Sequence, residues 1–296
     1  ASPSSHFKMQ ESVFKTKAFI ENGETIIYEA TFQFNGVLAA LDILVKDEDG
    51  WKAYEVKSST KVSDTYLNDA AIQYYAIVNS GIALKDISIV YINNQYVKQG
   101  AINIQELFTI ESVYDRVQDV LPKIPNQVER FKQVIAQDAV PDIDIGAQCS
   151  KPYDCDFKDH CWSHIPEYSI FNISRLGTTQ KFELYENGVT VFEDINLQRT
   201  ALNPDQVLQV ISELNQTSFI DKPKIKHFIE DLNDPLYFLD FETMGSAIPI
   251  FDNSRPYQQL VFQYSLHIQN DANEVTHHEY LAEANPNRDP REAFIK

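Results

Sequence analysis

Apolar residues, many of them β-branched or aromatic, predominate along residues 37–46 and 50–58, and a short polar turn, DEDG, separates the two runs. Runs of this composition are typical of strands, and a short turn containing Gly joins such strands as a hairpin. If the loop spans residues 47–50, the numbers of facing residues sum to 97. This register pairs Asp42 with Glu55, Leu41 with Val56 and Ile43 with Tyr54.

Side chains two positions apart on a strand share a face, so Asp42, Glu55 and Lys57 are predicted to lie together, with the small Ala40 opposite Lys57. Facing carboxylates at a Cβ separation of about 5 Å repel each other. A bound Mg²⁺ or Mn²⁺ ion removes this repulsion, because both ions prefer carboxylate oxygens. A lysine on the same face then positions a water or stabilises charge on a phosphate. The simpler alternative is an exposed, charged hairpin.

The remaining pattern predicts an α/β chain. Residues 8–34 are expected to begin with a helix or irregular segment and to end in a strand. Further helices and strands follow, and the cap of the next helix is expected at Thr60 or Ser63. Their predicted ranges are a helix at 62–80, a strand at 86–93, a mostly helical stretch at 104–136 broken by Pro122 and Pro125, a strand at 190–195, and helices at 204–214, capped by Asn203, and at 218–231.

Composition places the chain among globular proteins of about two domains, with 296 residues and 43% hydrophobic residues. The net charge of −18 counts against general nucleic-acid binding through a basic surface, but metal ions offset acidic groups at a local site. No apolar run of about 18 residues and no signal peptide are seen, so we expect a cytoplasmic protein without a membrane span. No P-loop motif is present, so no nucleotide motor is expected.

Three cysteines lie close together at Cys149, Cys155 and Cys161. An odd number in a chain without a secretion signal argues against a disulfide framework. Thiolates bind zinc or an iron–sulfur cluster, and either group usually takes four ligands. The fourth ligand is then His160, His164 or a cysteine elsewhere. The alternative is three ordinary free cysteines, which are often simply buried.

A second pair of carboxylates lies in the apolar run PLYFLDFET, at Asp240 and Glu242. Residues at i and i+2 of a strand share a face, so the two carboxylates are predicted to point to one side and Leu239 and Phe241 to the other. The next strand is expected within residues 255–267, leading to His277 and Glu279. Two carboxylates on the edge of a sheet are the alternative to a metal site.

The order Asp42, hairpin turn, Glu55, Val56, Lys57 resembles the PD-(D/E)XK nuclease core in its RecB-like branch. That family places a Gln and a Tyr on the following helix, which implies a site role for Gln73 within DAAIQYY. The usual Q-x-x-x-Y spacing is not met, because tyrosines follow one and two positions after Gln73. The resemblance implies that Asp42 and Glu55 bind Mg²⁺ or Mn²⁺, that Lys57 positions water, and that Gln73 orients Lys57 or a phosphate.

Other segments extend the resemblance. The cysteines resemble those of iron–sulfur nucleases of the AddB and CRISPR-associated types, which implies a [4Fe–4S] cluster with a fourth ligand outside this chain. The run FLDFET resembles the first motif of DnaQ-like (DEDD) exonucleases, which implies metal binding by Asp240 and Glu242, although the later motifs of that group are not found before Lys296. Residues 26–283 as a whole resemble a bacterial domain-of-unknown-function family that joins both domains.

The predicted fold is therefore α/β: a restriction-endonuclease-like mixed sheet flanked by helices, followed by the start of an RNase H-like domain. The expected boundaries are a nuclease domain at 1–148, a cysteine-rich loop at 149–168, a mostly helical connector at 169–232 and a truncated exonuclease-like domain at 233–296. The expected activity is metal-dependent hydrolysis of DNA, with single strands or ends favoured. Two alternatives stay open: a non-catalytic nucleic-acid-binding or scaffold module, and a zinc-binding adaptor centred on the cysteines.

Overall fold

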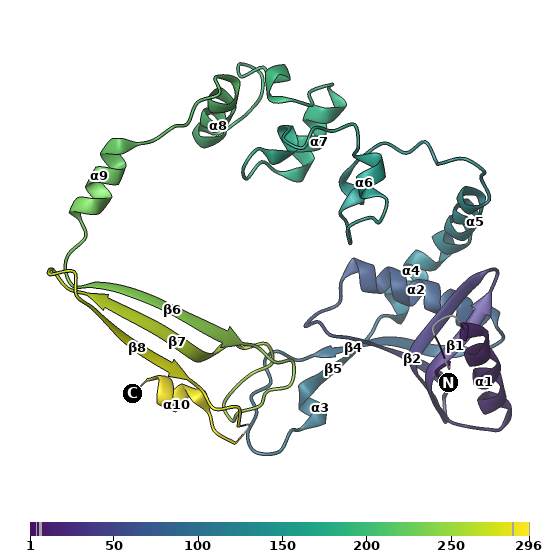
Figure 1. The fold of residues 1–296 in the computed structure, drawn as a ribbon. Coiled ribbons are helices and arrows are strands. Elements are labelled where there is room, and N and C mark those ends of the chain that lie inside the picture. The colour runs from purple at the N-terminus through teal and green to yellow at the C-terminus, as the bar shows by residue number, and fades with distance from the viewer. Residues whose placement is uncertain (4, 6–7, 286, 296) are drawn as a thin grey trace. The chain divides into compact units, whose positions relative to one another are not determined.

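The computed structural model describes residues 1–3, 5, 8–285 and 287–295, and the chain forms two compact units. One unit combines Ala1–Gln137 with Asp234–Lys296, and the other is Asp138–Asn233. The cysteine-rich segment and the helical connector therefore belong to one unit. The first unit contains a five-stranded sheet and a separate three-stranded sheet, flanked by helices, so the chain is mixed α/β (Figure 1).

The five-stranded sheet has the simple order β1-β2-β3-β4-β5. Only β3 and β4 are parallel, because α2 (Asp64–Asn79) connects them as a crossover, and the other neighbours are antiparallel. Helix α1 (Met9–Glu21) packs on β1, and α2 packs on β1, β2 and β4. The strands are β1 (Ile26–Phe34), β2 (Val37–Asp47), β3 (Gly50–Lys57), β4 (Leu84–Ile92) and β5 (Phe108–Ser112).

The hairpin of β2 and β3 has the predicted register over most of its length. Facing residues run from Ile43 and Tyr54 to Asp47 and Gly50. Asp47 Oδ1 accepts the backbone N–H groups of Asp49 and Gly50, at 3.0 and 3.2 Å, and Gly50 has a φ of +130°, which favours glycine in this turn.

The two predicted pairs beyond Ile43, Asp42 with Glu55 and Leu41 with Val56, lie outside this ladder. On the β1 side of the same point, Glu29 has a φ of +53° and does not pair with Asp42, although Tyr28 and Ala30 on either side of it pair with Ile43 and Leu41. Leu41 and Leu44 are both fully buried although they are three residues apart, so the alternation of faces is interrupted between them. The faces to which the side chains of β2 point therefore switch between Leu41 and Leu44, in the region of Asp42.

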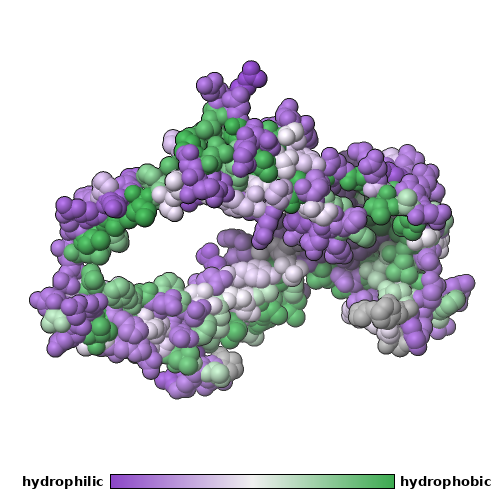
Figure 2. Space-filling view, turned by 45° about the horizontal axis from the view of Figure 1, so that its top comes forward, coloured by the Kyte–Doolittle hydropathy of each residue, from purple (hydrophilic) through white to green (hydrophobic). Residues whose placement is uncertain are grey.

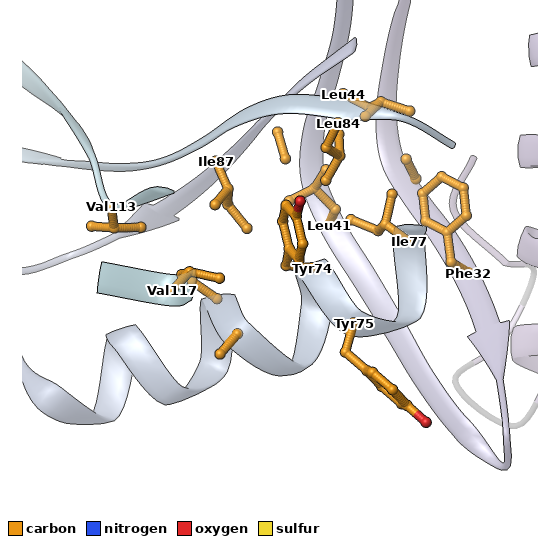
Figure 3. Packing of buried hydrophobic residues seen from close by; sticks show 14 of the residues in the cluster. Phe32, Leu41, Leu44, Tyr74, Tyr75, Ile77, Leu84, Ile87, Val113 and Val117 are labelled. Carbon is orange, nitrogen blue, oxygen red and sulfur yellow. The ribbon is translucent and has the colours of Figure 1, made fainter. Parts of the chain in front are cut away.

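The main core lies between the sheet and α2. Leu41, Leu44, Tyr74 and Ile77 belong to one buried cluster with residues of β1, β3 and β4 (Figure 3). Ser63 caps α2 by accepting the backbone N–H of Tyr66, as one of the two predicted caps. Tyr74 and Tyr75 point in different directions from the helix (Figure 3), and both are buried by packing.

The predicted helical stretch at 104–136 was wrong at residues 108–112, which form β5. Phe108 and Ile110 alternate with polar residues there, and five residues pair with β4, from Ser112 with Ser88 to Phe108 with Ile92. Pairing along the β4 edge outweighs the weak helical pattern of so short a segment. The helices around it are α3 (Ile104–Leu107), α4 (Tyr114–Val120), a 3₁₀ turn at Leu121–Lys123 and α5 (Ile124–Ile135).

The regular elements of the unit of residues 138–233 are helices and 3₁₀ turns, arranged around a small core that includes Ile170, Phe192 and Val210. The predicted strand at 190–195 was wrong, because Phe192–Asp194 forms a 3₁₀ turn in which the Asp194 carboxylate accepts the N–H of Val191. Asn203 caps the predicted helix at 204–214 in a capping box with Gln206. The helices are α6 (Lys158–Cys161), α7 (Thr178–Glu186), α8 (Pro204–Leu214) and α9 (Lys222–Glu230), with short 3₁₀ turns at Ala147–Cys149 and Ile170–Asn172.

The three-stranded sheet consists of β6 (Leu236–Met244), β7 (Leu260–Gln269) and β8 (Val275–Leu281), all antiparallel. The ring of Phe294, on the short helix α10 (Pro290–Phe294), packs edge-on against Tyr264 at 5.6 Å. Apolar side chains of β6, including Phe238 and Phe241, are more than half exposed, and green apolar patches interrupt the hydrophilic surface in Figure 2. Among the described residues, no helix is both long enough and apolar enough to cross a membrane.

Candidate functional site

The end of β3 and one face of α2 bring a lysine between two carboxylates. Lys57 Nζ lies 2.7 Å from Glu55 Oε1 and 2.5 Å from Asp69 Oδ2. Glu55 and Lys57 are two positions apart on β3 and share a face, as predicted. Burial alone would lower the pKa of Lys57, but the hydrogen bonds to Asp69 and Glu55 outweigh it and raise that pKa above its ordinary value. Lys57 is therefore a fixed positive charge at neutral pH.

Glu55 is the most buried acidic group of this cluster, with 6% of its surface exposed. Its Oε2 atom has no hydrogen-bond partner among the described residues. Burial is the largest influence on its pKa and raises it, the Asp42 carboxylate raises it further, and Lys57 and Gln73 partly offset the rise. A buried carboxylate oxygen without a donor is costly, so this atom is the clearest open position for a cation.

Asp42 lies directly beyond the end of the β2–β3 ladder. Its side chain, in place of a backbone carbonyl of β2, accepts a hydrogen bond from β3. Asp42 Oδ2 accepts the backbone N–H of Val56 at 2.6 Å. The contact places Asp42 against the peptide between Glu55 and Lys57, and its charge is close enough to raise the pKa of Glu55. The structure thus brings Asp42, Glu55 and Lys57 together by a side-chain bond where the sequence predicts a regular pair.

Helix α2 contributes three polar or aromatic side chains, at Tyr66, Asp69 and Gln73. Their spacing of i, i+3 and i+7 puts them on one helical face. Lys57 Nζ lies 5.5 Å from the centre of the Tyr66 ring, and Gln73 is buried beside Glu55, with its Oε1 atom lacking a hydrogen-bond partner in the described part of the chain. A site role was predicted from the sequence for Gln73 but not for Asp69 or Tyr66. The signal for Asp69 was its position four residues before Gln73.

The cluster contains three carboxylates and one ammonium group, so it carries excess negative charge. Two of the carboxylates, Asp42 and Glu55, are suited to a hard divalent cation, and Asp69 holds Lys57 instead. Over the described ranges, three or more His, Cys, Asp or Glu side chains do not gather with geometry for holding a metal. A cation at Glu55 would therefore need further oxygen ligands from the Val56 carbonyl, water or a phosphate.

The three cysteines lie within one short segment, with Cys149 at the end of a 3₁₀ turn and Cys161 at the end of α6, and they differ in exposure. Cys149 is buried, Cys161 is partly buried and Cys155 is exposed. The backbone N–H of Cys155 donates to the carbonyl of Cys149 at 2.9 Å, which folds the loop back on itself. Of the two candidate histidine ligands, His160 is exposed, and His164 Nε2 lies 3.0 Å from the Tyr185 hydroxyl.

Asp240 and Glu242 lie on β6, both exposed. Asp240 faces Ser265 on β7, and Ser265 faces Glu279 on β8, so the three residues form a row on one face of the sheet. Glu242 faces Gln263, and the register shifts directly after it. The structure thus confirms the shared face of Asp240 and Glu242 and adds Glu279 to it.

Comparison with known proteins gives a match to the last part of the chain. Residues 237–296 match a family model described as "Domain of unknown function (DUF2779)". This segment includes β7, β8, α10 and all but the first residue of β6. No curated protein matches the chain.

Proposed function

We propose that this chain is a divalent-cation-dependent nuclease that hydrolyses phosphodiester bonds in DNA. The observation that carries the proposal is the buried, unpartnered Oε2 atom of Glu55, next to a lysine held between two carboxylates. Further support comes from the mixed sheet with its β3–α2–β4 crossover, because a PD-(D/E)XK core of the RecB-like type would also have a mixed sheet in which a helix follows the Glu-x-Lys strand.

Glu55, Asp42 and the Val56 carbonyl are the groups that would hold Mg²⁺ or Mn²⁺. Both side chains offer oxygen ligands, and the local excess of negative charge favours a cation. When bound, the ion supplies Lewis acidity toward water and a phosphate oxygen. Asp42 also holds the Val56 peptide through its 2.6 Å hydrogen bond, so the same residue fixes the backbone that carries Lys57.

Lys57 supplies a fixed positive charge at the reacting phosphate. Its ammonium group has three N–H donors, of which Glu55 and Asp69 engage two. The third donor is available to orient a water or to bind a phosphate oxygen. In the reaction, water adds to phosphorus, one P–O ester bond breaks, and the leaving oxygen takes up a proton, giving a phosphate monoester and a free hydroxyl. Gln73 supports the cluster from α2 by contacting Glu55.

Two further assignments belong to the same proposal. Cys149, Cys155 and Cys161 would provide three thiolates to a [4Fe–4S] cluster completed by a ligand from elsewhere, and zinc is the alternative occupant. Asp240 and Glu242, on the segment that matches the domain of unknown function, would form the opening part of an exonuclease-like metal site.

The test measures cleavage of end-labelled single- and double-stranded DNA with Mn²⁺. We expect Lys57→Ala and Asp42→Asn to lose activity by about 10²–10⁴-fold, the range for removing a group that acts in proton transfer or charge stabilisation. Asp49→Asn is the matched control, because its carboxylate lies on the same hairpin with a side chain 82% exposed. DNA binding without cleavage by the folded wild-type protein would favour the non-catalytic binding module, and the nuclease proposal would then be wrong.

A further inference from the structure

The last residues of β3 have lost the neighbouring strand on the β2 side. The β2–β3 ladder ends at Ile43 and Tyr54, whereas on the other side β4 continues to pair with β3 up to Lys57 and Tyr91. Backbone groups that face the lost strand need other partners. Asp42 provides one of them, because its carboxylate accepts the Val56 N–H.

The backbone bends directly after β3, at Ser58 and Ser59. Ser59 O accepts the N–H of Ile92 on β4 at 2.9 Å. The hydroxyl of Tyr257 donates to Ser58 O at 3.0 Å. Lys57 is thus flanked by two side-chain bonds to the backbone, one from Asp42 and one from Tyr257.

Tyr257 is held firmly by its own segment, residues 252–257, which we name the clasp. Its first half pairs with the loop after β4: Asn253 N–H donates to Lys98 O at 2.8 Å, and Lys98 N–H donates to Ser254 O at 3.0 Å. Lys98 Nζ forms an ion pair with Asp252 Oδ1 at 2.5 Å, and Gly100 N–H donates to the same oxygen. The clasp is thereby tied to the loop after β4, the strand that pairs with Lys57.

The backbone of Tyr257 is in a strained conformation. Its φ is +60°, a left-handed value that is rare for a bulky residue. Its N–H donates to Ser246 O at 2.8 Å, which helps to hold this conformation. Strain of this kind persists where the surroundings dictate it, and from this backbone conformation the Tyr257 hydroxyl reaches Ser58 O.

We infer that Tyr257 is a positioning residue for Lys57, and that the clasp couples the C-terminal segment to the candidate nuclease site. The inference rests on the proposed function for its effect on catalysis, but the coupling itself is a property of the fold. Tyr257 fixes the carbonyl that follows Lys57, Asp42 fixes the N–H that precedes it, and together they hold the lysine between Glu55 and Asp69. Without the clasp, the same candidate metal ligands would be present, but the position of the Lys57 side chain would be less fixed.

The experiment compares Tyr257→Phe with wild type in the full chain. We expect the ¹⁵N–¹H signals of the Lys57 ammonium group and of the Val56–Ser58 amides to shift, because the hydroxyl that orders Ser58 is removed. In DNA cleavage with Mn²⁺ we expect kcat to fall about three- to tenfold, the effect of one neutral hydrogen bond, with KM unchanged. The matched control is Tyr280→Phe, which removes a tyrosine hydroxyl that bonds to Pro290 O, also in the C-terminal segment.

A second variant tests the clasp without altering Tyr257. Asp252→Asn weakens the ion pair with Lys98 and is expected to shift the same Lys57 signals, whereas Glu283→Gln, which weakens the exposed pair with Arg288, leaves them in place. If Tyr257→Phe shifts the Lys57 signals no more than Tyr280→Phe does, the inference is overturned. If the wild type cleaves DNA and Tyr257→Phe has the same kcat, the inference is also overturned. If the wild type does not cleave, the proposed function fails, and the shifts alone decide on the coupling.

Discussion

The ammonium group of Lys57 lies 2.5 Å from the carboxylate of Asp69, and this ion pair joins the end of β3 to α2. A lysine between two carboxylates has little freedom to swing into solvent, and only 19% of its side chain is exposed. Asp69 therefore orients Lys57 as a supporting carboxylate orients a functional histidine, by fixing the direction in which the ammonium group points. The pair is also the part of the site that sequence patterns signalled least.

Asp69→Asn is expected to lower DNA cleavage by about 10–100-fold, the usual effect of removing a group that orients a functional side chain. Asparagine keeps the size of the side chain but loses the charge that holds Lys57. The measurement is kcat with Mn²⁺, alongside the unfolding midpoint. Asp64→Asn, an exposed carboxylate in the first turn of the same helix, should keep wild-type activity. Equal activity of the two variants would exclude an orienting role for Asp69.

The raised pKa of Glu55 predicts a pH dependence of stability. The folded state binds a proton at Glu55 more tightly than the unfolded state, whose pKa stays near the ordinary 4.5. Glu55 therefore contributes stability that is fully present below that value and is lost as pH rises through the raised pKa. As pH rises from 4.5 through the raised pKa of Glu55, the free energy of unfolding of the wild type should therefore fall relative to that of Glu55→Gln. Urea unfolding with chelator at a series of pH values measures the difference, and parallel curves for the two proteins would contradict the prediction.

The sequence was sufficient to predict the hairpin, its register near the turn, α2 with Ser63 as one of two candidate caps, and the shared face of Glu55 and Lys57. These features depend on local composition, turn chemistry and capping. Asp42 was predicted as a site residue, but its contact with the Val56 N–H was not, because a regular register pairs Asp42 with Glu55 and the ladder ends before that pair. The strand β5 was missed for a related reason: its five residues are ordered by pairing with β4, a contact that no local pattern encodes.

Leu41→Ala tests the interrupted alternation in β2. Leu41 is fully buried although a regular strand with Leu44 inward would turn it outward. The substitution should lower the free energy of unfolding by about 2–5 kcal/mol, as expected for a leucine removed from a close-packed core. Leu38→Ala, at a position 37% exposed on the same strand, should cost much less. Urea denaturation compares them, and equal losses would place Leu41 outside the core.

The cysteine loop predicts metal content. Protein purified without oxygen is expected to contain iron and sulfide, with the broad visible absorbance of an iron–sulfur cluster, and Cys155→Ala should lose both because its thiolate is removed from the ligand set. Stoichiometric zinc without visible absorbance would support the zinc alternative instead. Ser150→Ala, in the same loop, is a control that leaves all three thiols in place. Elemental analysis and absorbance spectra distinguish these outcomes.

The hydrogen bond from Tyr257 to Ser58 joins residues 199 positions apart. During synthesis the ribosome must therefore add that whole length before the carbonyl beside Lys57 finds its partner, which takes about 10–40 s at ordinary elongation rates. Once Ser112 has been added, the nascent chain has all residues of the five-stranded sheet and its lysine, but not the phenol of Tyr257. A newly made chain would thus gain its final arrangement around Lys57 only after Tyr257 has been added.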